Sequence, residues 1–192
     1  MPGSRNRDDF IAAAKSLFAS RGFDGVTMRN IADALGLTQA ALYYHFTSKD
    51  ELYLAVLERT AEGTIANLKA AVKSHRKPVA RLRALLTELC QALYEDQDRG
   101  RLLLRSLIDE DKERGKVLGE GVFGVRLFQS EAAKIWPDLD SGEITLSLIA
   151  SCSYAYTLSD MRLHLPGIAK ETPSPEDYAD HLIRVLKIGD AS

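Results

Sequence analysis

The sequence predicts an all-α protein of about nine helices, and three observations support this fold class. Apolar residues recur every three or four positions along most of the 192-residue chain, which is the spacing of a helix face. Serine, threonine or aspartate precedes several of these periodic segments, as helix N-caps do. No segment shows the strict apolar–polar alternation that is typical of a half-buried strand.

Three short helices are predicted near the N-terminus. The first carries an apolar stripe and ends at Gly22, because glycine readily adopts the positive φ of a helix C-cap. Thr27 is the predicted N-cap of the second helix, which stops at Gly36 after little more than two turns. Thr38 is the predicted N-cap of the third helix, which runs through Phe46.

Longer helices follow. Ser48 and Glu51 have the spacing of a capping box that opens a fourth helix reaching about His75, and Pro78 is placed to start the fifth. Further helices are predicted over residues 98–113, 117–135, 140–164 and 174–186. We therefore expect two domains, a compact unit over residues 1–53 and a larger helical domain over residues 54–192.

Composition does not by itself indicate a nucleic-acid partner. Hydrophobic residues make up 45% and charged residues 27% of the chain, which is ordinary for a globular protein. The net charge is -2, and residues 1–53 contain six Lys or Arg and six Asp or Glu residues. A prediction of DNA binding therefore depends on local geometry rather than on total charge.

The expected location is the cytoplasm. Cys90 and Cys152 fit no metal or redox spacing, so we expect two buried thiols in a reducing compartment. The opening "MPGSRNRDDF" lacks the apolar core of a signal peptide. The most apolar long window, residues 144–158, is too short and too rich in serine to span a bilayer. No membrane contact, metal or cofactor is expected.

Residues 27–46 predict a helix-turn-helix unit packed on the first helix. Gly36 permits the sharp turn, and Ala32 is small where the two helices cross. The predicted inner face consists of Ile31, Leu35, Leu37, Leu42 and Phe46. The side chains left facing outward are Thr38, Gln39, Ala40, Tyr43 and Tyr44. An exposed helix face with a hydroxyl, an amide, a methyl and two phenols suits a DNA groove better than water.

The order of these residues resembles the DNA-binding domain of the tetracycline-repressor (TetR) family. The matching stretch is "GFDGVTMRNIADALGLTQAALYYHFTSKDELYLAVL" at residues 22–57. Its most diagnostic parts are T-x-R-x-I-A at 27–32, "LG" at 35–36 and "LYYHFTSKDEL" at 42–52. With the first helix, the resemblance covers about a quarter to a third of the chain. The rest matches the family only in being helical and of the right length.

The resemblance implies contacts to DNA bases and phosphates. Thr27 and Thr38 cap helices whose N-termini can meet phosphates, where the backbone N–H groups and the helix dipole favour anions. Arg29 is expected to reach a guanine edge and Gln39 an adenine, and the methyl of Ala40 is expected to touch a thymine methyl. An alternative for Arg29 is an ion pair with the residue four positions later.

The same resemblance implies contacts to the DNA backbone. Tyr43, Tyr44 and His45 correspond to the backbone-contacting aromatic residues of the family, and Lys49 corresponds to its phosphate-binding lysine. Other interpretations remain open, because Tyr44 and Phe46 can instead pack on neighbouring helices and His45 can cap the C-terminus of its helix.

Residues 119–124 read "GEGVFG", a literal G-x-G-x-x-G. In a dinucleotide-binding fold this pattern follows a buried strand and opens a helix. Here charged residues precede it and no βαβ pattern surrounds it. We therefore interpret the glycines as the start of a helix, or as an irregular helix that is locally soft.

The larger domain is expected to dimerise, as the family resemblance implies. Small side chains recur every four residues along one predicted helix, at Ser147, Ser151, Ala155 and Ser159. Such a stripe permits close helix packing, and with Leu182 and Val185 of the last helix it is expected to form half of a symmetric four-helix interface. The alternative is that the stripe packs within one subunit.

The effector pocket is weakly specified by the sequence. The candidate lining residues are Cys90, Phe123, Phe128, Trp136, Tyr154, Tyr156 and Met161, although residues of these types are more often plain core. This inventory favours a small apolar or aromatic effector over an anion. The alternative, an anionic effector, would use Arg101, Arg105, Arg126 and Arg162.

Together these inferences predict a homodimeric regulator, most simply a repressor, that binds double-stranded DNA at a near-palindromic operator. Its two recognition helices would enter successive major grooves about 34–36 Å apart. A small-molecule effector would release it by favouring a conformation with the wrong spacing. Two alternatives stay open, control by a protein partner and an enzyme. The enzyme alternative lacks any recognisable catalytic motif, and the four histidines are scattered.

Overall fold

The computed structural model describes residues 6–107, 124–157 and 162–186. These residues form nine α-helices and no strand, which confirms the predicted fold class. The helices are α1 (Arg7–Arg21), α2 (Met28–Ala34), α3 (Gln39–His45), α4 (Lys49–Lys73), α5 (Pro78–Glu95), α6 (Gln97–Leu107), α8 (Val125–Ile135), α9 (Ser141–Thr157) and α11 (Pro175–Val185).

Helix starts follow the predicted capping residues. The side chains of Thr27 and Thr38 accept hydrogen bonds from backbone N–H groups at the starts of α2 and α3, and Pro78 is the first residue of α5. The capping box at α4 is only half formed. Ser48 Oγ accepts from the backbone N–H of Glu51 at 3.1 Å, but the Glu51 carboxylate accepts from residue 47 instead of from Ser48.

The helix predicted over residues 117–135 is shorter among the described residues. Gly124 has a φ of 58°, in the left-handed region, and α8 begins only at Val125. Gly124 is thus the N-cap of α8, which agrees with the interpretation of this glycine as the start of a helix. The other glycines of "GEGVFG" lie outside the described residues, as do the predicted helical residues 108–113.

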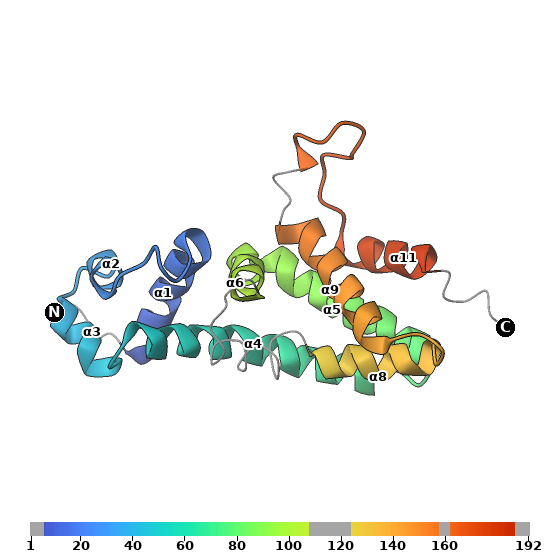
Figure 1. The fold of residues 1–192 in the computed structure, drawn as a ribbon, viewed down its shortest axis with the longest axis horizontal. Coiled ribbons are helices and arrows are strands. Elements are labelled where there is room, and N and C mark those ends of the chain that lie inside the picture. Colours follow the sequence, from blue (N-terminus) through green and yellow to red (C-terminus); the bar gives the residue numbers. More distant parts are fainter. Residues whose placement is uncertain (1–5, 108–123, 158–161, 187–192) are drawn as a thin grey trace.

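The long helix α4 connects two groups of helices (Figure 1). At one end of the molecule α1 packs on α4 and on α2, which contacts α3. At the other end α5 is central, since it contacts α4, α6, α8, α9 and α11. Helix α6 lies between the two groups and contacts both α1 and α9. The predicted boundary at residues 53/54 falls inside α4, so a continuous helix rather than a loop joins the groups.

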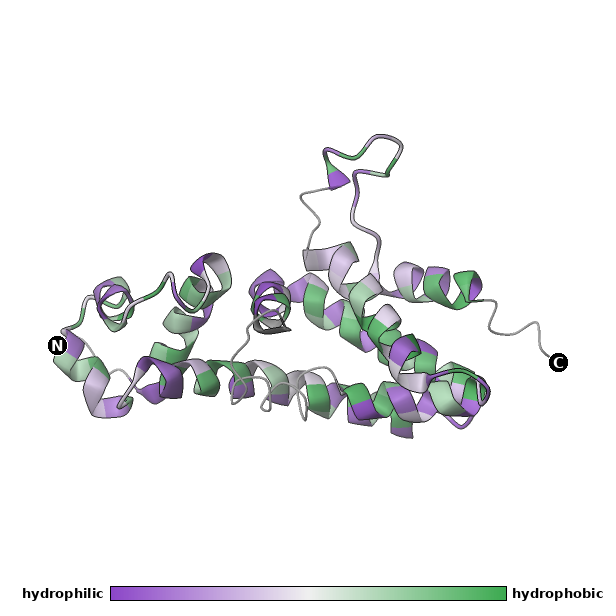
Figure 2. Ribbon diagram, viewed as in Figure 1, coloured by the Kyte–Doolittle hydropathy of each residue, from purple (hydrophilic) through white to green (hydrophobic). Residues whose placement is uncertain are grey.

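Burial of one face of each helix holds the bundle together. Hydrophobic and hydrophilic residues are interspersed along the helices (Figure 2), as amphipathic helices require. On α5 the buried residues include Leu82, Leu85, Leu86, Leu89 and Leu93. Each such leucine stabilises the fold by about 1.5–3 kcal/mol relative to an exposed position. Among the described residues, no helix combines the length and apolarity needed to cross a membrane.

Candidate nucleic-acid interface and ligand pocket

The helix-turn-helix scaffold is built from buried apolar residues and one glycine. Ile31, Leu42 and Phe46 are completely buried, as the sequence predicts. Gly36 has a φ of 67°, which allows the chain to turn sharply between α2 and α3. The backbone N–H of Leu37 then donates to the carbonyl of residue 32 at 3.0 Å and closes the turn. This packing fixes which side of α3 faces outward.

The outward face of α3 carries the predicted contact residues. Thr38, Gln39 and Ala40 are exposed. Tyr43 is 47% exposed and Tyr44 is 87% exposed, so neither ring belongs to the core. The alternative in which Tyr44 packs on a neighbouring helix is therefore wrong. Two exposed phenols on one short helix are unusual for a core helix and fit the predicted binding face.

His45 lies between the surface and the core. Its ring centroid is 4.9 Å from that of Phe10, in a tilted arrangement, and the residue is half-buried. The ring therefore packs on α1. Only its edge lies on the exposed face with Tyr43 and Tyr44. Phe46 is buried against the same region, and its ring centroid is 6.5 Å from that of Phe10.

The two predicted basic contacts differ in how firmly they are held. Arg29 Nε lies 3.7 Å from Asp33 Oδ2, and both side chains are mostly exposed. A solvated pair of this kind contributes at most about 0.5 kcal/mol, so it breaks easily in favour of DNA. Lys49 Nζ donates to the backbone carbonyl of Phe23 at 3.0 Å and sits 3.9 Å from the centroid of its ring. One of the three N–H groups of the Lys49 ammonium is thus used by this carbonyl, which leaves two for a phosphate.

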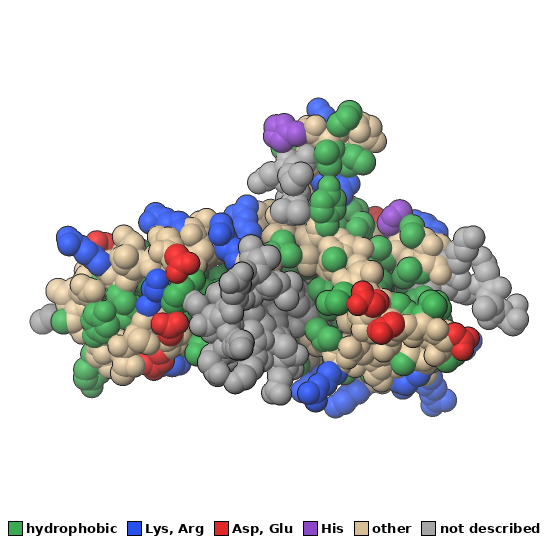
Figure 3. Space-filling view, in the orientation of Figure 1, with side chains coloured by type: hydrophobic (Ala, Val, Ile, Leu, Met, Phe, Trp, Pro, Cys, Tyr) green, Lys and Arg blue, Asp and Glu red, His purple; other side chains and the backbone are tan. Residues whose placement is uncertain are grey.

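Charge is mixed over this end of the molecule. Figure 3 shows Lys and Arg side chains interspersed with Asp and Glu over the group formed by α1–α3. Any affinity of this end for DNA must therefore come from individual contacts and helix N-termini, as the balanced composition of residues 1–53 also predicts.

Helix α6 is attached to α1 by paired side chains near its start. Lys15 forms an ion pair with Asp96, and Ser16 Oγ donates to Asp98 Oδ2 at 2.7 Å. Burial acts to raise the pKa of Asp96, but hydrogen bonds from Lys15 and from the backbone N–H of Arg99, together with the charges of these residues, outweigh it and lower the pKa below its usual value. Asp96 is therefore held as a carboxylate.

A third attachment lies further along α6. The guanidinium of Arg105 donates from Nε to the carbonyl of Ala19 and from Nη2 to the carbonyl of Ser20, both at 3.0 Å. These carbonyls belong to the last turn of α1, where a cation also interacts favourably with the helix dipole. The three attachments join α6, with the residue just before it, to α1. Helix α1 in turn packs on α2 of the helix-turn-helix unit.

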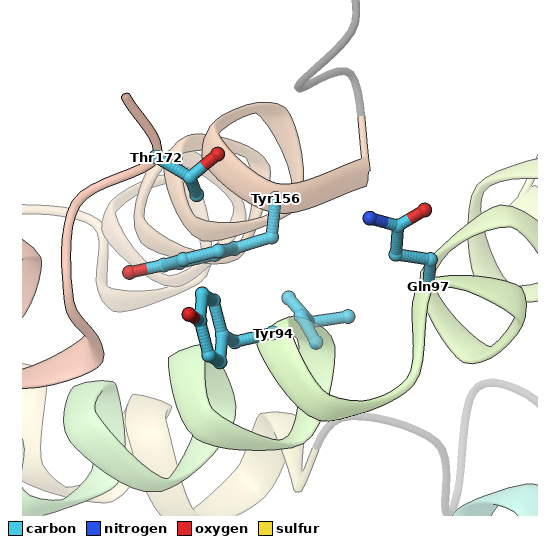
Figure 4. A pocket seen from close by; sticks show the side chains of 5 residues that line it. Tyr94, Gln97, Tyr156 and Thr172 are labelled. Atoms are coloured by element: carbon cyan, nitrogen blue, oxygen red, sulfur yellow. The ribbon is translucent and has the colours of Figure 1, made fainter. Parts of the chain in front are cut away.

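A pocket of about 340 Å³ opens beside the first of these attachments. It lies where the end of α5 and the start of α6 meet α9 and the loop before α11, and Figure 4 shows four of its side chains. The lining residues are Leu93, Tyr94, Gln97, Tyr156 and Thr172. Of the predicted pocket residues that the structure describes, only Tyr156 lines it.

The other predicted pocket residues lie elsewhere. Cys90 and Phe128 are completely buried in the core, Trp136 is half-buried at the end of α8, and Tyr154 is 43% exposed on the surface of α9. None of these four residues is among the five that line this pocket, and their role in ligand binding stays a prediction. Phe123 and Met161 lie outside the described residues.

The two cysteines, distant in sequence, meet in the core behind Tyr156. Cys90 and Cys152 are both buried and free, and their sulfur atoms are 3.5 Å apart. The hydrogen bond with Cys90 and burial raise the pKa of the Cys152 thiol well above its usual value. Burial, followed by the neighbouring Cys90, also raises the pKa of Tyr156. The Cys152 thiol and the Tyr156 hydroxyl therefore stay protonated at neutral pH.

The predicted dimer stripe is divided between surface and core. Ser147 is exposed and Ser151 is half-buried. Ala155 is completely buried and Leu182 is 7% exposed, so both pack within the subunit and their assignment to an interface surface is corrected. Ser159 lies outside the described residues.

The exposed apolar face of α9 is instead shifted by one position from the predicted stripe. It carries Leu146 (58% exposed), Ala150 and Tyr154, which also recur every four residues. Val185 of α11 is 61% exposed. The four-residue spacing of this face is present in the sequence. The small residues one position further along have the same spacing, so the sequence alone did not distinguish the two stripes. The pocket residues of α5, α6 and the 172 loop had no comparable local signal.

The fold and the outward face of α3 define the class of protein, a helix-turn-helix DNA-binding protein with a larger helical part. Residues 10–56 match the sequence model of the family described as "Bacterial regulatory proteins, tetR family". The helix-turn-helix end of the chain belongs to this family. The match covers the region of the predicted resemblance, which is the helix-turn-helix end of the chain.

Known relatives agree with this assignment. The HTH-type transcriptional activator FasR of Mycolicibacterium smegmatis is 32% identical over 106 residues, which are 55% of this chain and 48% of the relative. The chain thus matches over about half the length of its curated relatives.

Solved structures show the same fold over nearly the whole chain. The ketosteroid transcriptional regulator KstR2 of Mycobacterium tuberculosis has a TM-score of 0.73 at 19% identity, covering 97% of this chain and 94% of that one. FadR of Bacillus subtilis, solved in complex with stearoyl-CoA, has a TM-score of 0.75 at 12% identity, covering 97% of this chain and all (100%) of that one. At these identities the similarity shows the fold alone.

Proposed function

We propose that this chain is a cytoplasmic transcriptional repressor that binds a near-palindromic operator as a homodimer and is released by a small-molecule effector. One observation carries the proposal: α3 buries Leu42 and holds Gln39, Ala40, Tyr43 and Tyr44 out in solvent. A short helix that exposes an amide, a methyl and two phenols matches what a recognition helix presents to a major groove.

Within this proposal the contacts divide by role. Arg29, Gln39 and Ala40 read base edges, since they are exposed at the starts of α2 and α3. The sugar–phosphate backbone is contacted by Tyr43, Tyr44 and the edge of His45, and by the remaining N–H groups of Lys49. Thr27 and Thr38 hold the N-termini of α2 and α3 toward phosphates.

The first experiment is selection of duplex DNA from a randomised pool by the purified protein at physiological salt. Enrichment of an inverted repeat with half-sites about 10 base pairs apart, or a small multiple of that distance, is the expected result. Binding that is only salt-sensitive and shows no enriched sequence would contradict the proposal for the chain on its own.

Variants on the selected operator then separate the roles. Gln39→Ala is expected to relax sequence preference at one position per half-site, while Lys49→Met weakens all sequences alike and lowers the salt slope by about one unit. Tyr44→Ala is expected to weaken binding without a change in stability, because the side chain is 87% exposed. Leu139→Ala, an exposed residue at the opposite end of the molecule, is the matched control. An equal loss on every sequence from Gln39→Ala would remove it from base readout.

The homodimer is proposed to form through the exposed apolar face of α9 and Val185 of α11. Leu146, Ala150 and Tyr154 lie one helical turn apart along this face, as packing against a symmetry-related helix requires. Leu146→Glu is expected to shift the protein to monomers in sedimentation velocity, whereas Leu139→Glu is not. A dimer that persists in Leu146→Glu and Val185→Glu would place the interface elsewhere.

The effector is proposed to act through α6. This helix touches the pocket at Gln97 and holds α1 through Asp96, Asp98 and Arg105, so a shift of α6 changes the position of the helix-turn-helix unit. A pocket beside this connection favours a small ligand over a protein partner as the controlling molecule. The complex of B. subtilis FadR with stearoyl-CoA makes acyl-CoA thioesters one class of effector to be screened against operator binding.

A further inference from the structure

Three polar groups in the pocket are uncommitted. The Tyr94 hydroxyl, the Gln97 amide and the Thr172 hydroxyl make no hydrogen bond to another described residue. Figure 4 shows Gln97 and Thr172 on different sides of the pocket, with the two tyrosine rings between them. Such groups at the edge of a pocket fix the orientation of a ligand and give it specificity.

The apolar part of the pocket is mainly aromatic. The rings of Tyr94 and Tyr156 lie 6.0 Å apart at an interplanar angle of 86°, so they form two walls at a right angle. The Tyr156 hydroxyl already donates to the carbonyl of Ser174 at 3.2 Å, which fixes its ring as a wall rather than as a polar contact. A flat ring can stack on one wall while its edge meets the other.

No charged residue is among the five that line the pocket. The carboxylates on either side of Gln97 are engaged, Asp96 with Lys15 and Asp98 with Ser16. The residues that line the pocket therefore offer a charged ligand no partner of opposite charge.

We infer that this pocket binds an uncharged planar aromatic molecule carrying hydroxyl or carbonyl groups on its edge, and that Gln97 transmits its presence to α1. The inference rests on the proposed function and names the effector class and the connecting residue. Gln97 is the first residue of α6 and lies in sequence between Asp96 and Asp98, two of the three residues that hold α1. A ligand that hydrogen bonds to Gln97 therefore acts directly on this attachment.

Binding is tested on the full chain with four naphthalene probes of similar shape. The probes are 2,6-dihydroxynaphthalene, unsubstituted naphthalene, naphthalene-2,6-dicarboxylate and 2-naphthylmethylammonium, followed by their fluorescence. The uncharged diol is expected to bind at least about tenfold more tightly than each of the others, since it alone satisfies the pocket's polar groups without bringing a charge. A preference for either ion or for unsubstituted naphthalene, or no binding of the diol, overturns the ligand class.

Variants locate the site. Tyr94→Phe and Thr172→Val each remove one hydroxyl, and each is expected to weaken the diol by about two- to tenfold. Thr87→Val on the same helix as Tyr94 lies outside the pocket and is expected to leave binding unchanged. Melting curves confirm that each variant is folded. Equal affinity in all these variants means that the diol binds elsewhere and overturns the site.

Transmission is measured at saturating diol with the selected operator. Wild type and Thr172→Val are expected to lose the same factor of DNA affinity when the diol is added, about fivefold or more. Gln97→Ala is expected to lose less affinity, although the diol fills its pocket to the same extent. The same loss in Gln97→Ala removes Gln97 as the connecting residue, and no loss in wild type overturns the effector assignment. Operator binding without diol is recorded for each protein, so failure of the inference is distinguishable from failure to bind DNA.

Discussion

The crossing of α6 and α9 leaves no room for a side chain at Gly100. A Cβ atom at this position would lie 2.1 Å from Thr157 Oγ1, 3.2 Å from Thr157 Cβ and 3.3 Å from Leu93 Cδ2. The stiff χ1 of threonine limits how far its hydroxyl can move aside. We therefore predict that Gly100→Ala forces the two helices apart.

The magnitude follows from two opposing effects. Overpacking of this kind typically costs about 1–3 kcal/mol, whereas alanine in place of glycine within a helix contributes about 1 kcal/mol of stability. The expected result is a net loss of about 1 kcal/mol, which corresponds to about 2–4 °C in Tm for a chain of this size.

Removing the opposing hydroxyl should reverse the sign of the effect. Thr157 Oγ1 is buried without a hydrogen-bond partner among the described residues, so Thr157→Ala breaks no hydrogen bond. In that background Gly100→Ala is expected to be neutral or to stabilise by up to about 1 kcal/mol, giving a coupling energy of about 1–2 kcal/mol. Gly63→Ala is the control, because a Cβ there meets nothing within 4 Å and should only stabilise α4.

The assay is urea unfolding of the four proteins of this cycle and of the control, followed by circular dichroism at one protein concentration, since dimerisation makes stability depend on concentration. If Gly100→Ala has the same effect with and without Thr157→Ala, the close approach of α6 and α9 is refuted.

Three further predictions test local features. Thr38→Ala should lower stability by about 1 kcal/mol through loss of the α3 N-cap, as measured by thermal melting, and Thr38→Ser should not. Arg105→Ala should lose about 1–2 kcal/mol in urea unfolding because two carbonyls of α1 lose their donor, and a stability equal to wild type would show that water replaces it. The pKa of Asp96 is lowered in the folded state, so its stabilisation is present above about pH 4, the pKa of an unfolded aspartate, and is lost as pH falls through the folded pKa. The stability of wild type should therefore fall more steeply than that of Asp96→Asn below about pH 4, and parallel curves would argue against the Asp96 ion pair.

Much of the DNA-binding end could be predicted from the sequence because its signals are local. A capping threonine, a glycine turn and an apolar face all act within a few residues of one another, and they placed α2, α3 and the exposed tyrosines correctly. The structure adjusted details that depend on neighbouring helices, such as the position of His45 on Phe10 and the hydrogen bond between Lys49 and the Phe23 carbonyl.

The regulatory end was harder to predict because its site joins residues far apart in the chain. Tyr94, Gln97 and Thr172 belong to different segments, and nothing near any of them in the sequence marks a pocket. On α9 two stripes with the same spacing competed, and the packing of the bundle decided that Ala155 is buried and Tyr154 exposed.

The sequence by itself therefore determined the helical fold class, the helix-turn-helix unit and the residues that α3 exposes to solvent. Only the tertiary structure decided which faces of the later helices are free, where a pocket opens and which residues connect it to α1. The physical reason is range: capping and helical periodicity operate over three or four residues, whereas the pocket and the α1–α6 attachments depend on how separate helices pack against each other.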